Sequence, residues 1–136
     1  QKTNPPPNLA CRCFTHSTET ILWAKKNDKK SRHFFNYEKM KEENGGKQMK
    51  DVWSGALTKP SEKTEGKHPT QKPEYLLERI VLASTEEGQV IIDPFCGSGT
   101  TGVEAVRLGR KFIGIDVSEE YLQISKRRLE KVANDK

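Results

Sequence analysis

Six residues in the C-terminal half of the chain have the spacing of a nucleotide-binding turn. The stretch Gly97-Ser98-Gly99-Thr100-Thr101-Gly102 fits the pattern G-x-G-x-x-G. Asp116 lies about 20 residues further on, at the end of an expected strand, as this type of site requires. The glycines let the backbone approach a ligand, and the acidic side chain accepts hydrogen bonds from ribose hydroxyls. The pattern predicts a site for an adenosine-containing cofactor and does not by itself separate NAD from S-adenosylmethionine.

The residues before the glycines favour S-adenosylmethionine. Asp93-Pro94-Phe95 stands between the expected strand and Gly97, which places a carboxylate and an aromatic ring at the end of that strand. A carboxylate repels a pyrophosphate but suits the ammonium group of a methionine moiety. Phe95 is expected to supply an apolar wall. A turn that packs the core and binds no ligand is the alternative reading.

Strands and helices with clear signals surround this turn. Gln89–Asp93 is a β-branched run typical of a buried parallel strand, and Ser118 is placed to cap a following helix. Pro73 suits the first turn of an upstream helix. The expected order is a helix after residue 73, a strand over 89–93, a helix ending near 108, a strand over 111–116 and a helix from 118 to 132. This order predicts a βαβ unit followed by a helix.

Composition narrows the class of protein. The chain has 136 residues, the size of one domain, with 32% apolar and 32% charged residues. Neither a membrane-spanning stretch nor a signal peptide is evident, so we expect a soluble, intracellular protein. The three cysteines, Cys11, Cys13 and Cys96, are expected to be reduced. A lone Cys-x-Cys does not make a zinc site, and no metal centre is predicted.

The excess positive charge lies in one segment. Residues 25–67 contain 12 Lys and Arg against 7 Asp and Glu, whereas the rest of the chain contains 12 of each. The segment follows Thr20–Ala24, an apolar run expected to form a buried strand, and it has no sustained periodicity. One reading is a solvated loop. The other is a segment that binds a polyanion by releasing its counterions.

Several of these stretches together resemble one enzyme family. "HPTQKPEYLLERIV" followed by "DPFCGSGTTGVEAVRLGRKFIGIDVSEEYLQISKRRL" is similar to the S-adenosylmethionine region of the beta-class DNA amino-methyltransferases of restriction-modification systems. The similarity continues back through "DVW" and "FTHSTETILWAKK" to "NPPPN". It implies a Rossmann-like α/β methyltransferase fold with permuted motif order, incomplete in this chain. Residues 1–24 would end the catalytic half, 25–67 would be the target-recognition insertion, and 68–136 the cofactor-binding region.

The resemblance also assigns roles to residues. Lys72 would neutralise a carboxylate, with an ordinary surface charge as the alternative, and Trp53 is interpreted as an anchor for the loop rather than a contact to bases. The cofactor residues it implies are Asp93, Phe95, Gly97, Gly99, Thr100, Thr101, Asp116, Thr70, Gln71 and Lys72. The residues it implies for DNA contact are Lys29, Lys30, Arg32 and Lys50.

The stretch Asn4-Pro5-Pro6-Pro7 imitates the catalytic motif of this family. That motif is Asn, Asp or Ser, then Pro-Pro, then an aromatic residue that stacks on a flipped base, and Pro7 offers no aromatic face. The family has a separate Asn-Pro turn before its "FTH" stretch, and the present stretch matches that turn. We therefore interpret it as structural and expect the catalytic tetrapeptide to lie outside this chain.

The function implied by the resemblance is methylation of DNA at adenine N6 in the bacterial cytoplasm, with S-adenosylmethionine as cofactor. The expected partners are double-stranded DNA and a missing N-terminal part, and a homodimer is left open. Three alternatives remain: a cytosine-N4 enzyme, a non-catalytic DNA-specificity piece of a split methylase, and an NAD-dependent enzyme.

Overall fold

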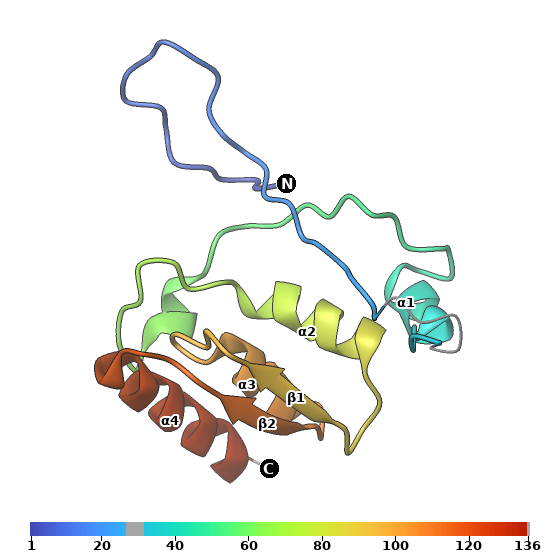
Figure 1. The fold of residues 1–136 in the computed structure, drawn as a ribbon. Helices are drawn as coiled ribbons and strands as arrows, with labels where there is room; N and C mark the ends of the chain where they lie inside the picture. Colours follow the sequence, from blue (N-terminus) through green and yellow to red (C-terminus); the bar gives the residue numbers. More distant parts are fainter. Residues whose placement is uncertain (27–31, 136) are drawn as a thin grey trace.

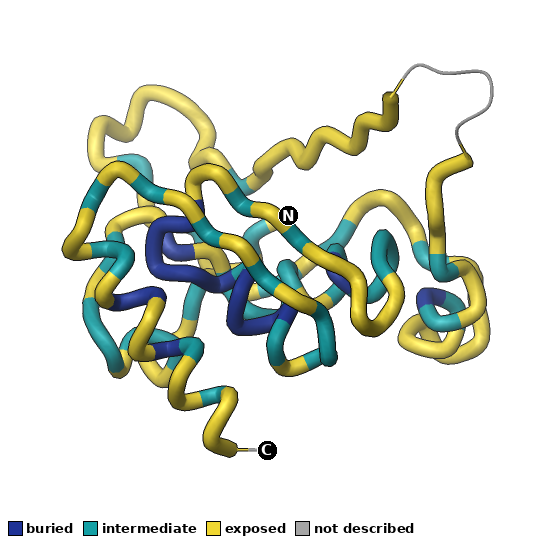
Figure 2. Tube along the Cα trace, turned by 60° about the horizontal axis from the view of Figure 1, so that its bottom comes forward, coloured by how far each residue is buried: buried dark blue, intermediate teal, exposed yellow. Residues whose placement is uncertain are grey.

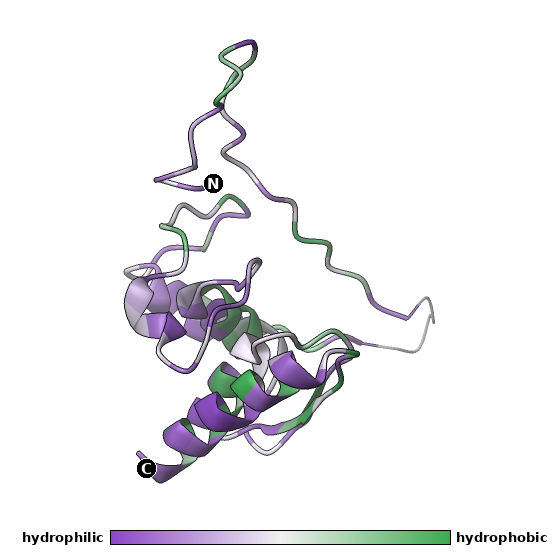
Figure 3. Cartoon of the chain, turned by 90° about the vertical axis from the view of Figure 1, so that its left-hand side faces the viewer, coloured by the Kyte–Doolittle hydropathy of each residue, from purple (hydrophilic) through white to green (hydrophobic). Residues whose placement is uncertain are grey.

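The computed structural model describes residues 1–26 and 32–135 of the chain. A long N-terminal loop extends away from a body of helices and strands, as two views show (Figures 1 and 3). The elements are α1 (Tyr37–Glu43), the 3-10 helix η1 (Pro60–Lys63), α2 (Glu74–Ser84), β1 (Val90–Asp93), α3 (Thr100–Arg107), β2 (Lys111–Gly114) and α4 (Glu119–Asn134). In the described part of the chain, no helix is both long enough and apolar enough to span a bilayer.

The predicted βαβ unit is confirmed. Strands β1 and β2 pair in parallel, with Val90 opposite Lys111 and Ile92 opposite Ile113, and α3 connects them. Helix α3 packs against both strands, and α2 and α4 pack against α3 in turn. The α/β class follows from this arrangement, because parallel neighbours need a crossover connection and here that connection is a helix.

The core is centred on α3 and the turn that precedes it. Figure 2 shows the buried part of the trace gathered there, and Val103 and Ala105 are 1% and 0% exposed. Gly102 lets α3 approach the sheet, because a Cβ at this position would lie 2.4 Å from the Phe112 ring. The turn is therefore wedged between the strands that end beside it and the helices behind it.

Local signals placed the ends of these elements correctly. Ser118 caps α4, since its side chain accepts a hydrogen bond from the Tyr121 N–H. Gly109 follows the end of α3 with φ of 80°, a conformation that favours glycine at a helix terminus. Both caps depend only on neighbours in sequence, and for that reason sequence reasoning could find them.

One face of the sheet is apolar and exposed. Val90, Ile92, Ile113 and Ile115 are 50–62% exposed. They alternate along the two strands with half-buried residues such as Phe112, whose ring lies against Gly102 of α3. Within the described residues, helices cover the opposite face only. Such a face is unusual on a monomer and marks a surface that another layer normally covers.

The predicted strand over Thr20–Ala24 is wrong. These residues belong to no strand, and Ile21, Leu22 and Trp23 are 51%, 89% and 61% exposed. An apolar run becomes a buried strand only beside a pairing strand and a covering layer, and β1 and β2 pair with each other instead. The Trp23 ring packs against the rings of His33 and Phe35.

The basic segment contains more structure than its sequence indicated. Helix α1 is capped by Asn36, whose side chain accepts from the Lys39 N–H, and Met40 is buried. The Asn36 N–H also donates to the Ala83 carbonyl at the end of α2, which ties α1 to that helix. Seven residues with a single buried side chain leave too little periodicity to be recognised.

The N-terminal proline-rich turn holds a distant loop. The Asn4 side chain accepts a hydrogen bond from the Leu57 N–H at 2.8 Å. Lys2 bridges to Gly55, and the Thr3 N–H donates to the Gly55 carbonyl. The side-chain oxygen of Asn4 is therefore already hydrogen-bonded to a backbone N–H group, as expected for a structural turn.

Candidate functional site

The glycine turn has a backbone that only glycine adopts easily. Gly97 and Gly99 have φ of 50° and 74°, and Gly99 is the N-cap of α3. A Cβ on Gly97 would lie 2.9 Å from His68 Nε2, and one on Gly99 would lie 2.1 Å from Ser125 Oγ. The turn is therefore packed between the segment at His68 on one side and α4 on the other.

Asp93 organises the start of the turn from the end of β1. Its Oδ1 accepts from the Phe95 N–H at 3.1 Å, and its Oδ2 accepts from Thr101 Oγ1 at 2.7 Å. Phe95, in contrast, is 86% exposed. The expected carboxylate is in place at the carboxyl end of a parallel strand, where ligands bind in open α/β sheets.

Asp116 supports the turn from the neighbouring strand. Its two carboxylate oxygens accept hydrogen bonds from the Ser118 and Gly97 N–H groups, at 2.9 and 2.8 Å. These two bonds hold the pKa of Asp116 below its usual value, so the side chain is a carboxylate at neutral pH. Each oxygen keeps a lone pair that a ribose hydroxyl could use.

The segment at residues 68–72 faces the turn. The His68 ring stacks edge-on against Tyr121, and its Nδ1 accepts from the Thr70 N–H at 3.3 Å. Gln71 is buried, and its Nε2 donates to the Glu62 carbonyl at 2.6 Å. Its Oε1 is buried without a hydrogen-bond partner in the described structure.

Lys72 already has a partner within the protein. Its Nζ donates to Glu19 at 2.9 Å, and Glu19 also pairs with Lys2 at 2.7 Å. Lys2 first, and Lys72 second, lower the pKa of Glu19 to about 2. Lys72 is therefore already paired within the chain, and this pair links the N-terminal segment to the cavity. The role of Lys72 toward a cofactor stays a prediction.

Two segments far apart in sequence line one cavity of about 180 Å³. Of the ten predicted cofactor residues, Gly99 and Asp116 stand outside the lining and the other eight are in it. Four further lining residues were not predicted: His68, Leu77, Cys96 and Ser98. His68, Cys96 and Ser98 lie inside the recognised motifs, and Leu77 lies on the apolar face of α2. None of the lining residues comes from residues 1–24.

The chemistry of this cavity fits the methionine part of S-adenosylmethionine. It offers a carboxylate for an ammonium group, threonine hydroxyls for a carboxylate, and Leu77 and Phe95 as apolar wall. Cavities that hold a whole drug-sized ligand are larger, about 300–1,000 Å³. The cavity therefore suits part of the cofactor, with Asp116 beside it for the ribose. Within residues 1–26 and 32–135, no group of three His, Cys, Asp or Glu side chains could hold a metal ion.

The predicted DNA contacts are only partly described. Arg32 and Lys50 are exposed, whereas Lys29 and Lys30 lie outside the described residues. Trp53 is half-buried, its Nε1 donates to the Lys50 carbonyl at 2.6 Å, and the Arg79 guanidinium lies 5.0 Å from its ring. These contacts support the interpretation of Trp53 as an anchor that ties the loop to α2.

Comparison with known proteins gives the class to which this fold and site belong. The DNA methylase family model matches residues 1–127, so the chain belongs to that family. A solved structure described as an M1.HpyAVI complex with SAM is 40% identical, with a TM-score of 0.71 over 94% of this chain and 58% of its own. The structure of PvuII DNA methyltransferase, described as cytosine-N4-specific, is 26% identical with a TM-score of 0.55 over 64% of this chain.

Among curated relatives, the similarity is higher. Type II methyltransferase M2.LlaDCHI of Lactococcus lactis subsp. cremoris is 76% identical over 98% of this chain, and M2.DpnII of Streptococcus pneumoniae is 75% identical over 96%. M2.MboI of Moraxella bovis is 53% identical over 97% of this chain. The chain spans about half the length of these relatives, 48–49%. The solved structures confirm the Rossmann-like methyltransferase fold expected from the sequence, and this chain contains a portion of that fold.

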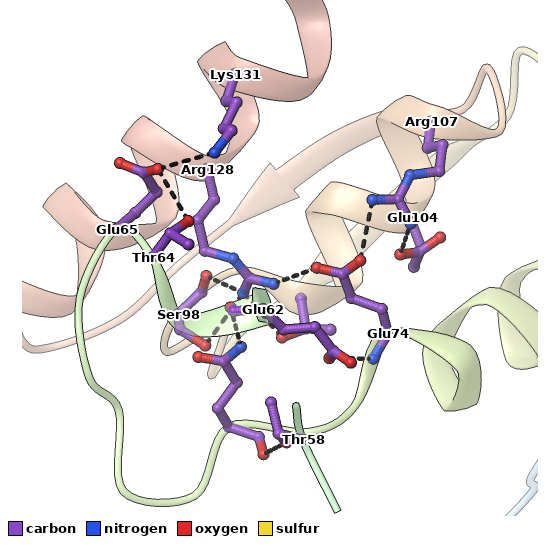
Figure 4. A network of polar contacts seen from close by, with 12 residues as sticks. Thr58, Glu62, Thr64, Glu65, Glu74, Ser98, Glu104, Arg107, Arg128 and Lys131 are labelled. Carbon is purple, nitrogen blue, oxygen red and sulfur yellow. Dashed lines mark hydrogen bonds and ion pairs between the residues drawn. The ribbon is translucent and has the colours of Figure 1, made fainter. Parts of the chain in front are cut away.

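Behind the cavity lies a chain of charged groups that sequence reasoning missed (Figure 4). Arg128 of α4 is 5% exposed and donates to the Ser98 carbonyl, the Thr100 hydroxyl and Glu74, at 2.8, 3.0 and 2.9 Å. Glu74 also pairs with Arg107 at 3.0 Å. Arg128 falls one turn after the buried Ile124 and Ser125. An arginine at a core position of an amphipathic helix was the available signal.

Glu104 ends this chain of charges inside α3. Its side chain is fully buried, Oε1 accepts from Arg107 at 2.5 Å, and Oε2 has no hydrogen-bond partner in the described structure. Burial raises the pKa of Glu104 to about 7, although Arg107 opposes the rise; Glu74 and Glu78 add to it. The folded protein therefore binds this proton more tightly than the unfolded chain does.

Glu104 should make stability fall as pH rises. Its contribution is fully present below about pH 4.5 and is lost by about pH 7, because only the unfolded chain releases the proton easily in that interval. Glu104→Gln removes this dependence. The free energy of unfolding of the variant relative to the parent should therefore rise by up to roughly 3 kcal/mol across the interval. Urea unfolding at several pH values measures it, with the exposed Glu130→Gln as control. A difference that is constant with pH would contradict the assignment.

Proposed function

We propose that this chain is the cofactor-binding and target-recognition part of a DNA methyltransferase that acts on adenine N6 with S-adenosylmethionine. One observation carries the proposal: the segment at 68–72 and the glycine turn at 93–101 meet in one cavity whose chemistry fits the methionine part of that cofactor. Membership of the DNA methylase family supports it. So does the similarity to a structure whose description includes SAM.

The residues of this chain bind and orient; they are not the groups that hold the reacting amine. Asp93 is placed for the cofactor ammonium, and Asp116 for the ribose hydroxyls. When bound, S-adenosylmethionine supplies a sulfonium methyl group. The tetrapeptide that would hold the target amine lies outside this chain in our proposal, because the Asn4 side chain is bonded to the Leu57 N–H. We call this chain together with the segment that supplies that tetrapeptide the assembled enzyme.

Adenine is the proposed target base, as the sequence resemblance implies. Identity to the structure described as cytosine-N4-specific is only 26%. A cytosine-N4 enzyme is the second candidate, supported by the shared fold. Double-stranded DNA is the proposed substrate and the basic segment at 25–67 the proposed contact, in the cytoplasm of a bacterium with a restriction-modification system.

Asp116→Ala should weaken binding of S-adenosylmethionine to the assembled enzyme by about tenfold or more, because a charged acceptor for ribose hydroxyls is removed. Asp116→Asn, which keeps one acceptor oxygen, should have a smaller effect. Isothermal titration calorimetry gives both dissociation constants. An unchanged value for the alanine variant would mean that the adenosine is held elsewhere.

Neutralising Lys29, Lys30 and Arg32 together should weaken binding to every DNA sequence. The slope of log affinity against log salt should flatten by about 0.9 for each phosphate that the protein no longer neutralises. Fluorescence anisotropy at several salt concentrations measures the slope. The control replaces Arg12, Lys111 and Lys126, three exposed cations outside the basic segment with the same total charge. Equal slopes for the two triple variants would leave the segment as a solvated loop.

The isolated chain should be poorly soluble and inactive. The apolar sheet face, with Ile92 62% exposed, favours association, and the catalytic tetrapeptide is outside the chain. A separately supplied N-terminal fragment with an Asp-Pro-Pro-aromatic motif should restore both solubility and methyl transfer. Incorporation of labelled methyl groups into DNA is the measurement. Robust transfer by the isolated chain would refute the proposal and return Asn4-Pro5-Pro6-Pro7 to consideration as the catalytic motif.

A further inference from the structure

The hydroxyl groups of the adjacent residues Thr100 and Thr101 play different hydrogen-bonding roles: Thr101 donates and Thr100 accepts. Thr101 uses its hydroxyl hydrogen to donate to Asp93 Oδ2 at 2.7 Å. Arg128 can only donate, so Thr100 Oγ1 must accept from its Nη1 at 3.0 Å. The hydroxyl hydrogen of Thr100 is therefore left for another acceptor.

Arg128 also fixes where Thr100 stands. Its guanidinium donates to the Ser98 carbonyl at 2.8 Å, which leaves that buried backbone oxygen satisfied. Glu74 holds the other guanidinium nitrogen at 2.9 Å, and Arg107 holds the second oxygen of Glu74 at 3.0 Å. Figure 4 shows the guanidinium between Glu74 and the turn. A planar group bonded on both sides in this way has little freedom to move away.

Thr100 lines the cavity together with Asp93 and Lys72. The methionine part of the cofactor carries one ammonium and one carboxylate. Asp93 suits the ammonium, and the Lys72 ammonium is already paired with Glu19. The hydroxyl of Thr100 is a donor that remains for the carboxylate, and acceptance from a cationic guanidinium makes it a stronger one.

We propose that Arg128 is a positioning residue for the cofactor: it holds Thr100 so that the threonine hydroxyl donates to the carboxylate of the methionine part. The inference rests on the proposed function, since it assumes that S-adenosylmethionine occupies the cavity. Arg128 itself does not touch the ligand. Its effect should therefore be specific to one group of the cofactor.

The experiment compares S-adenosylmethionine with its decarboxylated analogue, S-adenosylmethioninamine, in calorimetric titrations of the assembled enzyme. Arg128→Met and Thr100→Val should each weaken binding of S-adenosylmethionine about tenfold and change binding of the analogue less than about twofold. The double variant should bind no more weakly than either single variant, because both changes remove one interaction. Arg128→Lys should recover part of the affinity.

Arg127→Met is the matched control. This residue precedes Arg128 on α4, is exposed and donates to the Glu65 carbonyl at 2.9 Å, so its replacement should leave both affinities unchanged. Thermal unfolding of each variant separates folding from binding, and if Arg128→Met does not fold, Arg128→Lys and Thr100→Val give the answer. Equal weakening for the two ligands, or none, would overturn the role of Arg128 while leaving the proposed function intact. A parent enzyme that binds neither ligand would instead refute the cofactor assignment itself.

Discussion

Buried backbone groups in the turn between β1 and α3 must find hydrogen-bond partners, and two charged side chains provide them. Asp116 accepts from the Gly97 N–H, and Arg128 donates to the Ser98 carbonyl. Asp116 follows β2 and Arg128 lies on α4, so one continuous stretch of chain supplies both the acceptor for an N–H group and the donor for a carbonyl of the turn. A turn with two glycines at positive φ has little intrinsic preference for a single shape. The shape of the cavity therefore depends on α4 being docked, although α4 contributes none of its lining residues.

The elements nearest this turn could be predicted from sequence because their signals are local. The cap at Ser118, the glycine after α3 and the β-branched run before Asp93 each depend on neighbouring residues. The run at Thr20–Ala24 has similar composition, yet its state depends on whether another strand lies beside it. The sequence did not predict helix α1, because this helix is held mainly by contacts to α2 and has only Met40 buried. Tertiary context decided both cases.

The residues of the candidate site also fall into those that local sequence patterns predict and those that only tertiary contacts reveal. Motif residues such as Asp93, Thr100 and Gln71 were found because a recognisable spacing marks them, and the structure brings them into one cavity. Arg128 was overlooked because an arginine in a helix is usually on the surface, and nothing adjacent in sequence shows that Glu74 will meet it. Lys72 shows a further limit of sequence reasoning. A cation can be expected beside a ligand, but its pairing with Glu19 joins residues 53 positions apart.

The ties at Gly55, Leu57 and Trp53 have a consequence for how such proteins diverge. Residues 2–4 hold the chain at 55–57, and Trp53 rests against Arg79 of α2, so the basic segment is fastened at a fixed place near residues 53–57. Loops fastened at their ends tolerate changes in length at small entropic cost. We expect homologous proteins to lengthen or shorten the stretch between α1 and Trp53, because α1 is itself tied to α2. Under the proposed function, new DNA-sequence preferences would arise in this stretch while residues 68–135 keep the cofactor cavity.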